Sequence, residues 1–247
     1  MALTRLFIRG ELRPNSNLQL DQEQARYIGR ALRLRPGDSL TVFNADDGEF
    51  SATVASVGKA NAELSVGTAI ETRTESPLKV HLVQGVSRGE RMDLIVQKAT
   101  ELGVKRITPV LTEYGVVKLD GDRAEKRRDH WEKIAISACE QSGRIRPPLI
   151  DKPLALKSWF GGKTAAADVD LILQPGAATS MASLTTPRTK VCLLIGPEGG
   201  FSDVEYDDAR VSGFTAVSLG PRVLRTETAA IAAVAIAESL WGDLGLN

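Results

Sequence analysis

Cysteine and histidine are scarce in this chain. Among 247 residues only Cys139 and Cys192 are cysteines, and only His81 and His130 are histidines. Each cysteine lies inside an apolar segment without a second cysteine or a histidine at metal-ligand spacing, so both are read as buried free thiols. One histidine falls in an expected core strand and the other on a charged helix. These placements disfavour a histidine metal site and a Ser-His-Asp triad, and no metal is expected.

Long apolar runs are also missing. No stretch reaches the roughly eighteen apolar residues of a membrane span, and the first five residues lack the apolar core of a signal peptide. The sequence therefore predicts a cytoplasmic protein without a membrane partner. It contains no Gly-Lys-Ser/Thr phosphate loop and no Gly-x-Gly-x-x-Gly motif, which argues against a nucleoside triphosphate or dinucleotide ligand.

Net charge is absent as well, since 31 basic residues balance 31 acidic ones. The first forty residues differ from this average because they hold seven arginines and no lysine: Arg5, Arg9, Arg13, Arg26, Arg30, Arg33 and Arg35. Local arginine excess is typical of a surface that contacts phosphates, although a solvated basic face is an equally good reading for any single arginine.

The N-terminal part reads as short strands separated by turns. β-Branched and aromatic residues gather at 6–8, 39–43, 50–57 and 62–70, with turn signals between them. The exception is 21–34, where apolar residues recur at helical spacing behind Asp21 as a candidate N-cap. These patterns predict a small β-barrel domain over residues 1–72.

After a polar linker that ends at Pro77, strands and helices alternate. Strands are expected at 80–83, 106–111, 169–173, 191–195 and 214–219, and helices at 90–102, 122–141, 202–211 and 226–241. This alternation is typical of an α/β fold with a largely parallel sheet covered on both faces, and predicts a second domain over 77–247.

A glycine-rich loop follows the expected strand 191–195. In Gly196-Pro197-Glu198-Gly199-Gly200 the glycines let the backbone turn sharply and approach a ligand, and Ser202 with Glu205 forms a capping box for the next helix. A plain strand-to-helix turn is the alternative. An inward-facing Glu198 carboxylate favours a binding role.

Two more loops end apolar strands. One places Arg225 and Glu227 at the start of a mostly apolar helix, and the other is Leu173-Gln174-Pro175. The structural alternative has Thr226 capping the helix and Arg225 paired with Glu227. Because open α/β sheets bind ligands at the carboxyl ends of their strands, three such loops indicate one binding site.

Six blocks of the chain, in the same order, resemble the SPOUT-class methyltransferases, in particular the group that methylates N3 of a uridine in 16S ribosomal RNA. The blocks are Tyr27–Asp38, Ser87–Met92, Gln97–Val104, Ala138–Arg144, Gly196–Gly200 and Leu219–Thr228. One departure is Gln174, which stands where the family has a histidine before the proline.

The resemblance implies a PUA-like β-barrel followed by a SPOUT domain with a C-terminal trefoil knot, a homodimer, and S-adenosyl-L-methionine as cofactor. The implied cofactor-binding residues are Leu173, Gln174, Pro175, Ile195, Gly196, Pro197, Glu198, Gly199, Gly200, Leu219, Gly220, Arg222, Val223, Leu224, Thr226, Thr228 and Ala229. Small-subunit ribosomal RNA is the implied partner, held by Arg9, Arg30, Arg33, Arg35 and Arg88.

Methylation of N3 requires loss of its proton, so negative charge must be stabilised on the base carbonyls. Arg225 is the expected stabilising residue, with Glu198, Glu227 or water as proton acceptor. The alternatives are a methyltransferase for another base or a ribose 2′-hydroxyl, and a non-catalytic RNA-binding factor in ribosome assembly.

Overall fold

The computed structural model describes residues 4–58, 60–163 and 167–245. By contacts between Cα atoms the chain forms two compact units. The first holds the N-terminal residues up to Glu75 together with Cys139–Arg146, and the second holds the remaining residues from Ser76 onward.

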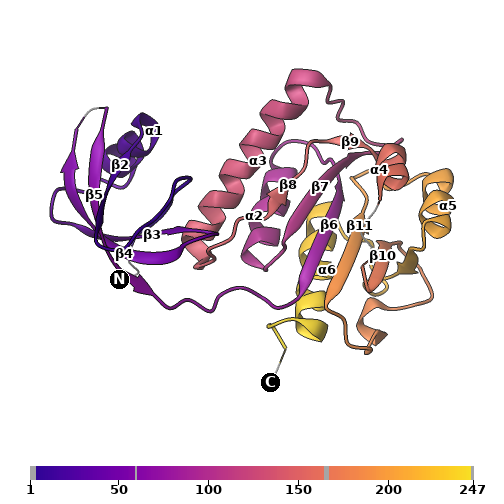
Figure 1. The fold of residues 1–247 in the computed structure, drawn as a ribbon. Coiled ribbons are helices and arrows are strands. Elements are labelled where there is room, and N and C mark those ends of the chain that lie inside the picture. Colours follow the sequence, from indigo (N-terminus) through magenta and orange to yellow (C-terminus); the bar gives the residue numbers. More distant parts are fainter. Residues whose placement is uncertain (1–3, 59, 164–166, 246–247) are drawn as a thin grey trace. The chain divides into compact units, whose positions relative to one another are not determined.

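The first unit is a mixed five-stranded sheet with the strand order β1-β3-β4-β5-β2 (Figure 1). Its strands are β1 (Arg5–Phe7), β2 (Ser16–Leu20), β3 (Ser39–Asn44), β4 (Gly48–Val57) and β5 (Ala62–Ile70). The β1 and β3 strands are parallel, and the other neighbours are antiparallel. The β2 strand was not expected, because its residues are mostly polar and alternate between exposed and half-buried. Alternating apolar residues such as Leu40, Val42 and Leu64 form the core of this unit.

The helix expected at 21–34 is two shorter elements. Asp21 caps α1 (Gln22–Arg26), as predicted, and also forms a capping box with Gln24, but the chain then forms a π-helix over Tyr27–Ala31. Ile28 in this π-helix is fully buried in the core of the first unit. Arg33 ends the segment with a φ angle of 57°, in the left-handed region that stops a helix.

Arg5 has a structural role inside the first unit. Its Nε atom donates to Glu49 over 2.9 Å, and its Nη1 atom donates to the carbonyl oxygen of Cys139 over 2.6 Å. Glu140 accepts from the backbone N–H of Phe7. These bonds explain why Cys139–Arg146 groups with the first unit. Arg5 is therefore mostly buried, unlike the exposed arginines of the N-terminal segment.

The second unit is built on a seven-stranded parallel sheet with the order β12-β10-β11-β6-β7-β8, in which β9 also pairs with β7. The ladders are parallel throughout. The strands are β6 (Lys79–Gly85), β7 (Arg106–Leu111), β8 (Leu149–Ile150), β9 (Leu154–Ala155), β10 (Val169–Leu173), β11 (Lys190–Ile195) and β12 (Thr215–Val217).

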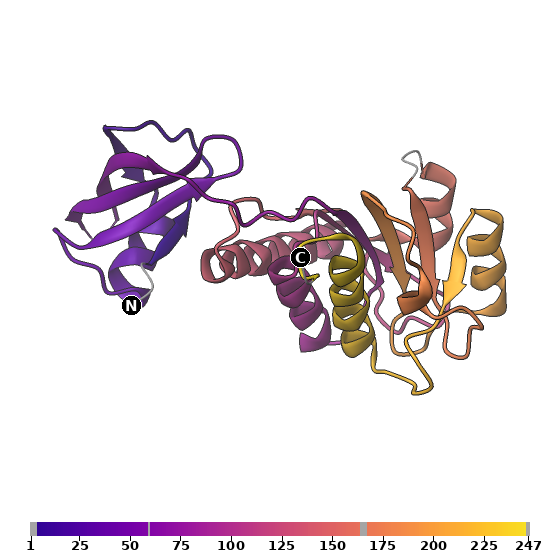
Figure 2. The same cartoon turned by 90° about the horizontal axis from the view of Figure 1, so that it is seen from below.

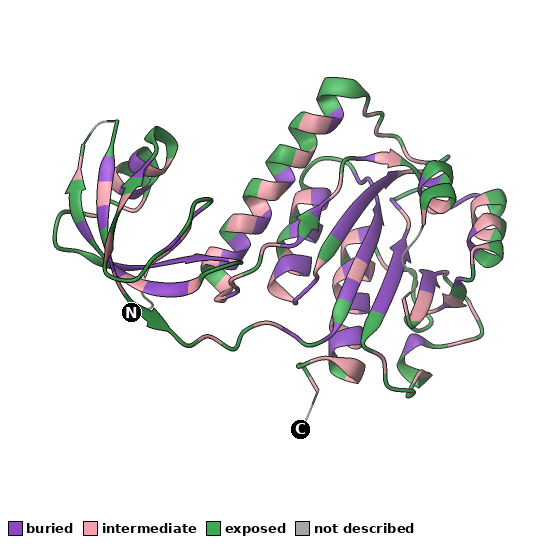
Figure 3. Ribbon diagram, viewed as in Figure 1, coloured by how far each residue is buried: buried purple, intermediate pink, exposed green. Residues whose placement is uncertain are grey.

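Helices cover both faces of this sheet (Figure 2). One layer packs α2 (Glu90–Glu101), α3 (Gly121–Ser142) and α6 (Thr226–Trp241) on a core that includes Leu82 and Val191. The other layer packs α4 (Leu156–Gly162) and α5 (Asp203–Val211) against Val83 and Leu194. Burial on both faces makes the central strands almost continuously buried (Figure 3).

The parallel α/β fold is confirmed, and so is the capping box of Ser202 and Glu205 at α5. The strand expected at 214–219 is shorter, because β12 ends at Val217 and the chain enters a loop. Short elements without clear periodicity were missed, namely β8, β9, α4 and a 3₁₀ turn at Met181–Ser183. Cys139 and Cys192 are free and buried, as predicted.

Candidate functional site

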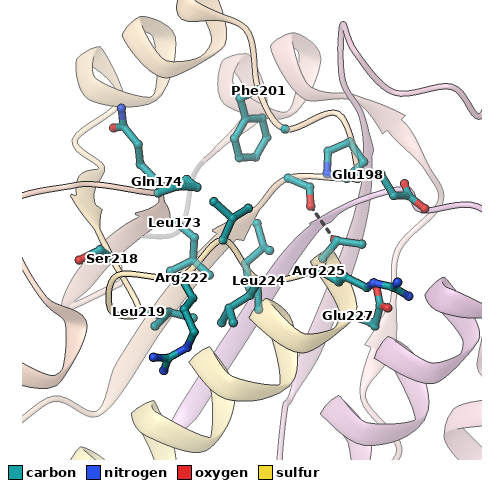
Figure 4. Close-up of a pocket in the computed structure, with 18 of the residues that line it drawn as sticks. Leu173, Gln174, Glu198, Phe201, Ser218, Leu219, Arg222, Leu224, Arg225 and Glu227 are labelled. Atoms are coloured by element: carbon teal, nitrogen blue, oxygen red, sulfur yellow. Dashed lines mark hydrogen bonds between the residues drawn. The ribbon is translucent and has the colours of Figure 1, made fainter.

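An open cavity of about 490 Å³ lies where β10, β11 and β12 end. Three loops line it, following these three strands, and together with the start of α6 they enclose it (Figure 4). The sequence predicts that the three loops meet, and the structure confirms it. Most of the predicted cofactor residues line the cavity: Leu173, Gln174, Pro175, Ile195, Gly196, Pro197, Glu198, Gly200, Leu219, Gly220, Arg222, Val223, Leu224, Thr226 and Ala229.

Two predicted cofactor residues do not line the cavity. Thr228 is exposed on α6 outside it. A Cβ atom at Gly199 would lie 2.7 Å from the carbonyl oxygen of Tyr114, so the close approach that requires glycine here is to the protein's own backbone. Gly199 therefore lets the glycine loop pack closely against the backbone of Tyr114, on the side of the loop away from the cavity.

The loop after β12 presents unused hydrogen-bond donors. In the part of the chain that the structure describes, the backbone N–H groups of Leu219, Gly220 and Leu224 donate to no protein acceptor. The side chains of Leu219 and Leu224 line the same cavity. An apolar wall beside free amide donors suits a ligand with one flat apolar part and several polar ends.

Thr226 joins the glycine loop to α6. Its hydroxyl donates to the carbonyl oxygen of Gly196 over 2.7 Å and accepts from Nε2 of Gln84 over 3.1 Å. The alternative in which Thr226 caps α6 is wrong, because Arg225 occupies the N-cap position and no side chain caps this helix. Gln84 is fully buried at the end of β6.

Glu198 is exposed, which corrects the expectation of an inward-facing carboxylate. Its Oε1 atom accepts from Nη1 of Arg91 over 2.6 Å and from the backbone N–H of Arg88 over 3.0 Å. Partial burial raises the pKa of Glu198, but the hydrogen bonds, including those from Arg91 and Arg88, outweigh it and leave the pKa below its usual value. This ion pair ties α2 to the glycine loop and makes Glu198 a weak base.

Arg225 and Glu227 lie on the same side of the loop, where α6 begins, whereas Arg222 points in a different direction (Figure 4). Within the described residues Arg225 makes no ion pair with Glu227, so that structural alternative is also wrong. The Oε2 atom of Glu227 is buried and accepts no hydrogen bond from the described protein. A guanidinium and a carboxylate are thus both available to a ligand here.

Sequence reasoning missed five residues that line the cavity: Arg91, Phe201, Tyr206, Val217 and Ser218. Arg91 comes from α2, far from the loops in the chain, and only the fold brings it there. Phe201 and Tyr206 pack edge to face with ring centroids 5.6 Å apart. Phe201 directly follows the glycine loop and Tyr206 lies near the start of α5, and this closeness to the loop was the signal that could have identified them.

The predicted RNA-binding residues Arg9, Arg30, Arg33, Arg35 and Arg88 are all exposed. Across the described residues no helix has the length and apolar character needed to cross a membrane. Over the same ranges no group of three or more His, Cys, Asp or Glu is arranged to hold a metal ion.

Fold and cavity together define a parallel α/β protein with a ligand site at its strand ends, joined to a small mixed β-sheet unit. Two family models match these parts, an RNA methyltransferase domain over residues 74–238 and an RNA methyltransferase PUA domain over residues 20–66. The chain therefore belongs to the RNA methyltransferase family that these models describe.

Relatives match over the whole length. A ribosomal RNA small subunit methyltransferase E of Buchnera aphidicola is 35% identical, with 98% of each chain covered. The ribosomal RNA small subunit methyltransferase E of Neisseria gonorrhoeae, solved bound to S-adenosyl methionine, has a TM-score of 0.90 and 35% identity, with 98% and 99% covered. A Legionella pneumophila structure in complex with the cofactor SAM has a TM-score of 0.94 and 40% identity, with 99% and 100% covered.

Proposed function

We propose that this protein transfers a methyl group from S-adenosyl-L-methionine to N3 of one uridine in 16S ribosomal RNA of the small subunit. The observation that carries the proposal is the cavity at the strand ends, where free backbone donors, an apolar wall and the pair Arg225 and Glu227 meet. Relatives with the name ribosomal RNA small subunit methyltransferase E supply the class of substrate.

The cavity fits this cofactor. Its volume of about 490 Å³ falls within the range of small-molecule sites. Leu173, Leu219 and Leu224 offer apolar surface to the adenine, and the amides of the loop after β12 donate to its polar groups. The cofactor supplies an electrophilic methyl group on a sulfonium, so no metal ion is needed for an in-line displacement.

The chain's own residues prepare the acceptor nitrogen. Glu227 is the better proton acceptor, because its buried Oε2 atom is unpartnered whereas Glu198 is engaged by Arg91 and Arg88. Arg225 donates to a base carbonyl oxygen as negative charge develops there. In this scheme Glu198 positions the glycine loop.

In this proposal residues 1–72, which belong to the first unit, form the RNA-docking domain, and residues 77–247 form the catalytic domain. Support comes from the PUA family match and from the exposed arginines Arg9, Arg30, Arg33 and Arg35, joined by Arg88 beside the cavity. We further propose a homodimer and a C-terminal trefoil knot. Val223 lines the cavity with 82% of its surface exposed, and in a homodimer a second copy would cover this side chain.

The test is site-resolved mass spectrometry of 16S ribosomal RNA from cells that lack the protein, before and after treatment of small subunits with purified protein and labelled S-adenosyl-L-methionine. We expect one missing N3-methyluridine that is restored by the wild type and not by an Arg225→Lys variant. A labelled methyl group on another base or on a ribose 2′-hydroxyl would show that uridine N3 is not the methyl acceptor. RNA binding without any label would indicate a non-catalytic assembly factor.

A further inference from the structure

A second cavity, of about 500 Å³, opens on the α4 side of the large sheet. It lies at the strand-start edge, since Lys79, Arg106 and Lys190 are the first residues of β6, β7 and β11. It shares no lining residue with the cavity at the strand ends. Its lining carries six cationic side chains: Lys79, Lys105, Arg106, Lys152, Lys163 and Lys190.

Two of these cations, Lys79 and Lys190, form no ion pair among the described residues, although the charge of Lys190 acts on the carboxylate of Asp168. Lys79 and Lys190 are direct partners in the ladder between β6 and β11, so their side chains leave the sheet side by side on one face. Like charges placed opposite each other on neighbouring strands destabilise a sheet. Neither ammonium group has a carboxylate within 4.0 Å in the part of the chain that the structure describes. The carboxylate of Asp168 lies nearby but accepts from the backbone N–H groups of Thr189 and Lys190.

Three other cations of this cavity are paired with carboxylates of the protein itself. Arg106 pairs with Asp151 over 2.7 Å, Lys163 with Asp170 over 2.5 Å, and Lys152 with Glu125 over 2.9 Å. Unlike these three cations, Lys79 and Lys190 have no carboxylate partner among the described residues. They present two positive charges at one edge of a concave site.

The floor of the cavity holds a hydrogen-bonded row of His81, Thr108 and Asp151. Thr108 donates its hydroxyl proton to Asp151, so it accepts from Nε2 of His81, 2.7 Å away. Burial and the neighbouring Arg106 lower the pKa of His81 to about 4, and the imidazole is therefore neutral near neutral pH. This tautomer leaves Nδ1 as an acceptor. Leu154, Trp159 and Cys192 form an apolar wall beside it.

We propose that this cavity binds a phosphate monoester of nucleoside monophosphate size, with its phosphate between Lys79 and Lys190. Two adjacent ammonium groups match the charge of about −1.5 to −2 that such a phosphate carries at neutral pH. Lysine binds phosphate well as a point charge. The apolar wall and the histidine floor would hold the uncharged body of the ligand, and the cavity volume falls in the range of small-molecule sites.

Isothermal titration of the full-length protein with uridine 5′-monophosphate tests this proposal. Saturable binding is expected, with uridine binding at least about tenfold more weakly because it lacks the phosphate. Replacing Lys79 and Lys190 together by Met should weaken binding by roughly tenfold, since both lysines are exposed and each solvent-screened charge contact accounts for about two- to fivefold. Lys157→Met is the matched control, because Lys157 is an exposed lysine of α4 outside the cavity and its loss should leave the affinity unchanged.

The affinity of the same variants for S-adenosylhomocysteine separates this cavity from the other one. It should equal that of the wild type, and saturating S-adenosylhomocysteine should not displace uridine 5′-monophosphate. The proposal is overturned by any of three results: no saturable binding, equal binding by the Lys79→Met/Lys190→Met variant, or competition between the two ligands. Binding of a single-stranded oligonucleotide through these lysines without binding of the monophosphate would likewise overturn it.

Discussion

The hydroxyl of Thr226, at the first turn of α6, donates a 2.7 Å hydrogen bond to the carbonyl oxygen of Gly196 in the glycine loop. Through this bond the two loops that supply most of the cavity's backbone are held at a fixed separation, although thirty residues separate them in the chain. The side-chain amide of Gln84 in β6 donates a hydrogen bond to the same hydroxyl.

Thr226→Val should therefore weaken cofactor binding while keeping the shape of the side chain. Loss of the hydroxyl leaves the Gly196 carbonyl and the Gln84 amide without this partner, at a cost of about 1–3 kcal/mol. Calorimetry with S-adenosylhomocysteine should show roughly a tenfold or greater rise in Kd. Thr228→Val is the control, since Thr228 is exposed outside the cavity. If it raised Kd as much as Thr226→Val does, Thr228 would have to be counted as a cofactor-binding residue.

Gly85→Ala tests the packing behind the glycine loop. A Cβ atom at Gly85 would lie 2.3 Å from Cδ and 2.5 Å from the nitrogen of Pro197, and both atoms belong to a rigid ring that cannot move aside. Overpacking of this kind costs about 1–3 kcal/mol of unfolding free energy and should displace the loop. Urea denaturation measures the stability, with Gly161→Ala in α4 as the control, since no atom lies within 4 Å of a Cβ there.

The acid dependence of cofactor binding should reflect Glu198. Burial raises its folded-state pKa, but hydrogen bonds from backbone N–H groups and from Arg91 outweigh burial and leave the pKa below the usual value, so the ion pair is complete near neutral pH and is lost only as pH falls through that lowered value. Glu198→Gln removes the charge at every pH. We expect Kd to rise about two- to fivefold near neutral pH, as for a partly exposed pair. An equal Kd for wild type and variant near neutral pH would show that the pair does not hold the loop.

Arg225→Lys should impair chemistry more than binding. The lysine keeps the charge but loses the planar set of donors, and removal of one donor from an anion site costs roughly a hundredfold to a thousandfold in rate. Single-turnover methylation of small subunits at saturating cofactor is the measurement. Partial recovery at higher pH is expected, because N3 then loses its proton without help. A defect explained wholly by weaker cofactor binding would move Arg225 from the chemistry to the pocket.

Arg30→Glu together with Arg35→Glu should weaken binding to ribosomal RNA and flatten its salt dependence, by about one unit of slope for every phosphate that is no longer neutralised. Arg33 is left in place because its φ of 57° makes any substitution there a test of backbone strain as well. Electrophoretic mobility at several salt concentrations gives the slope. S-adenosylhomocysteine affinity should not change; an unchanged salt slope would remove this surface from RNA docking.

Local patterns in the sequence were sufficient to predict the longer parallel strands, Asp21 as the cap of α1, the capping box of α5, and the three loops that meet at the ends of β10, β11 and β12. These features depend on side-chain period and cap chemistry within a few residues, which a linear sequence displays directly. The trefoil knot and the limits of the two domains stay predictions.

Only the tertiary structure decided what each loop residue faces. Gly199 contacts Tyr114, Glu198 is held by Arg91, and Thr226 bonds to Gly196, because segments far apart in the chain pack together. The same holds for Lys79 and Lys190, whose pairing depends on the register of β6 against β11. Register and long-range packing are set by the burial of whole faces of the sheet, so no local pattern could have specified these contacts.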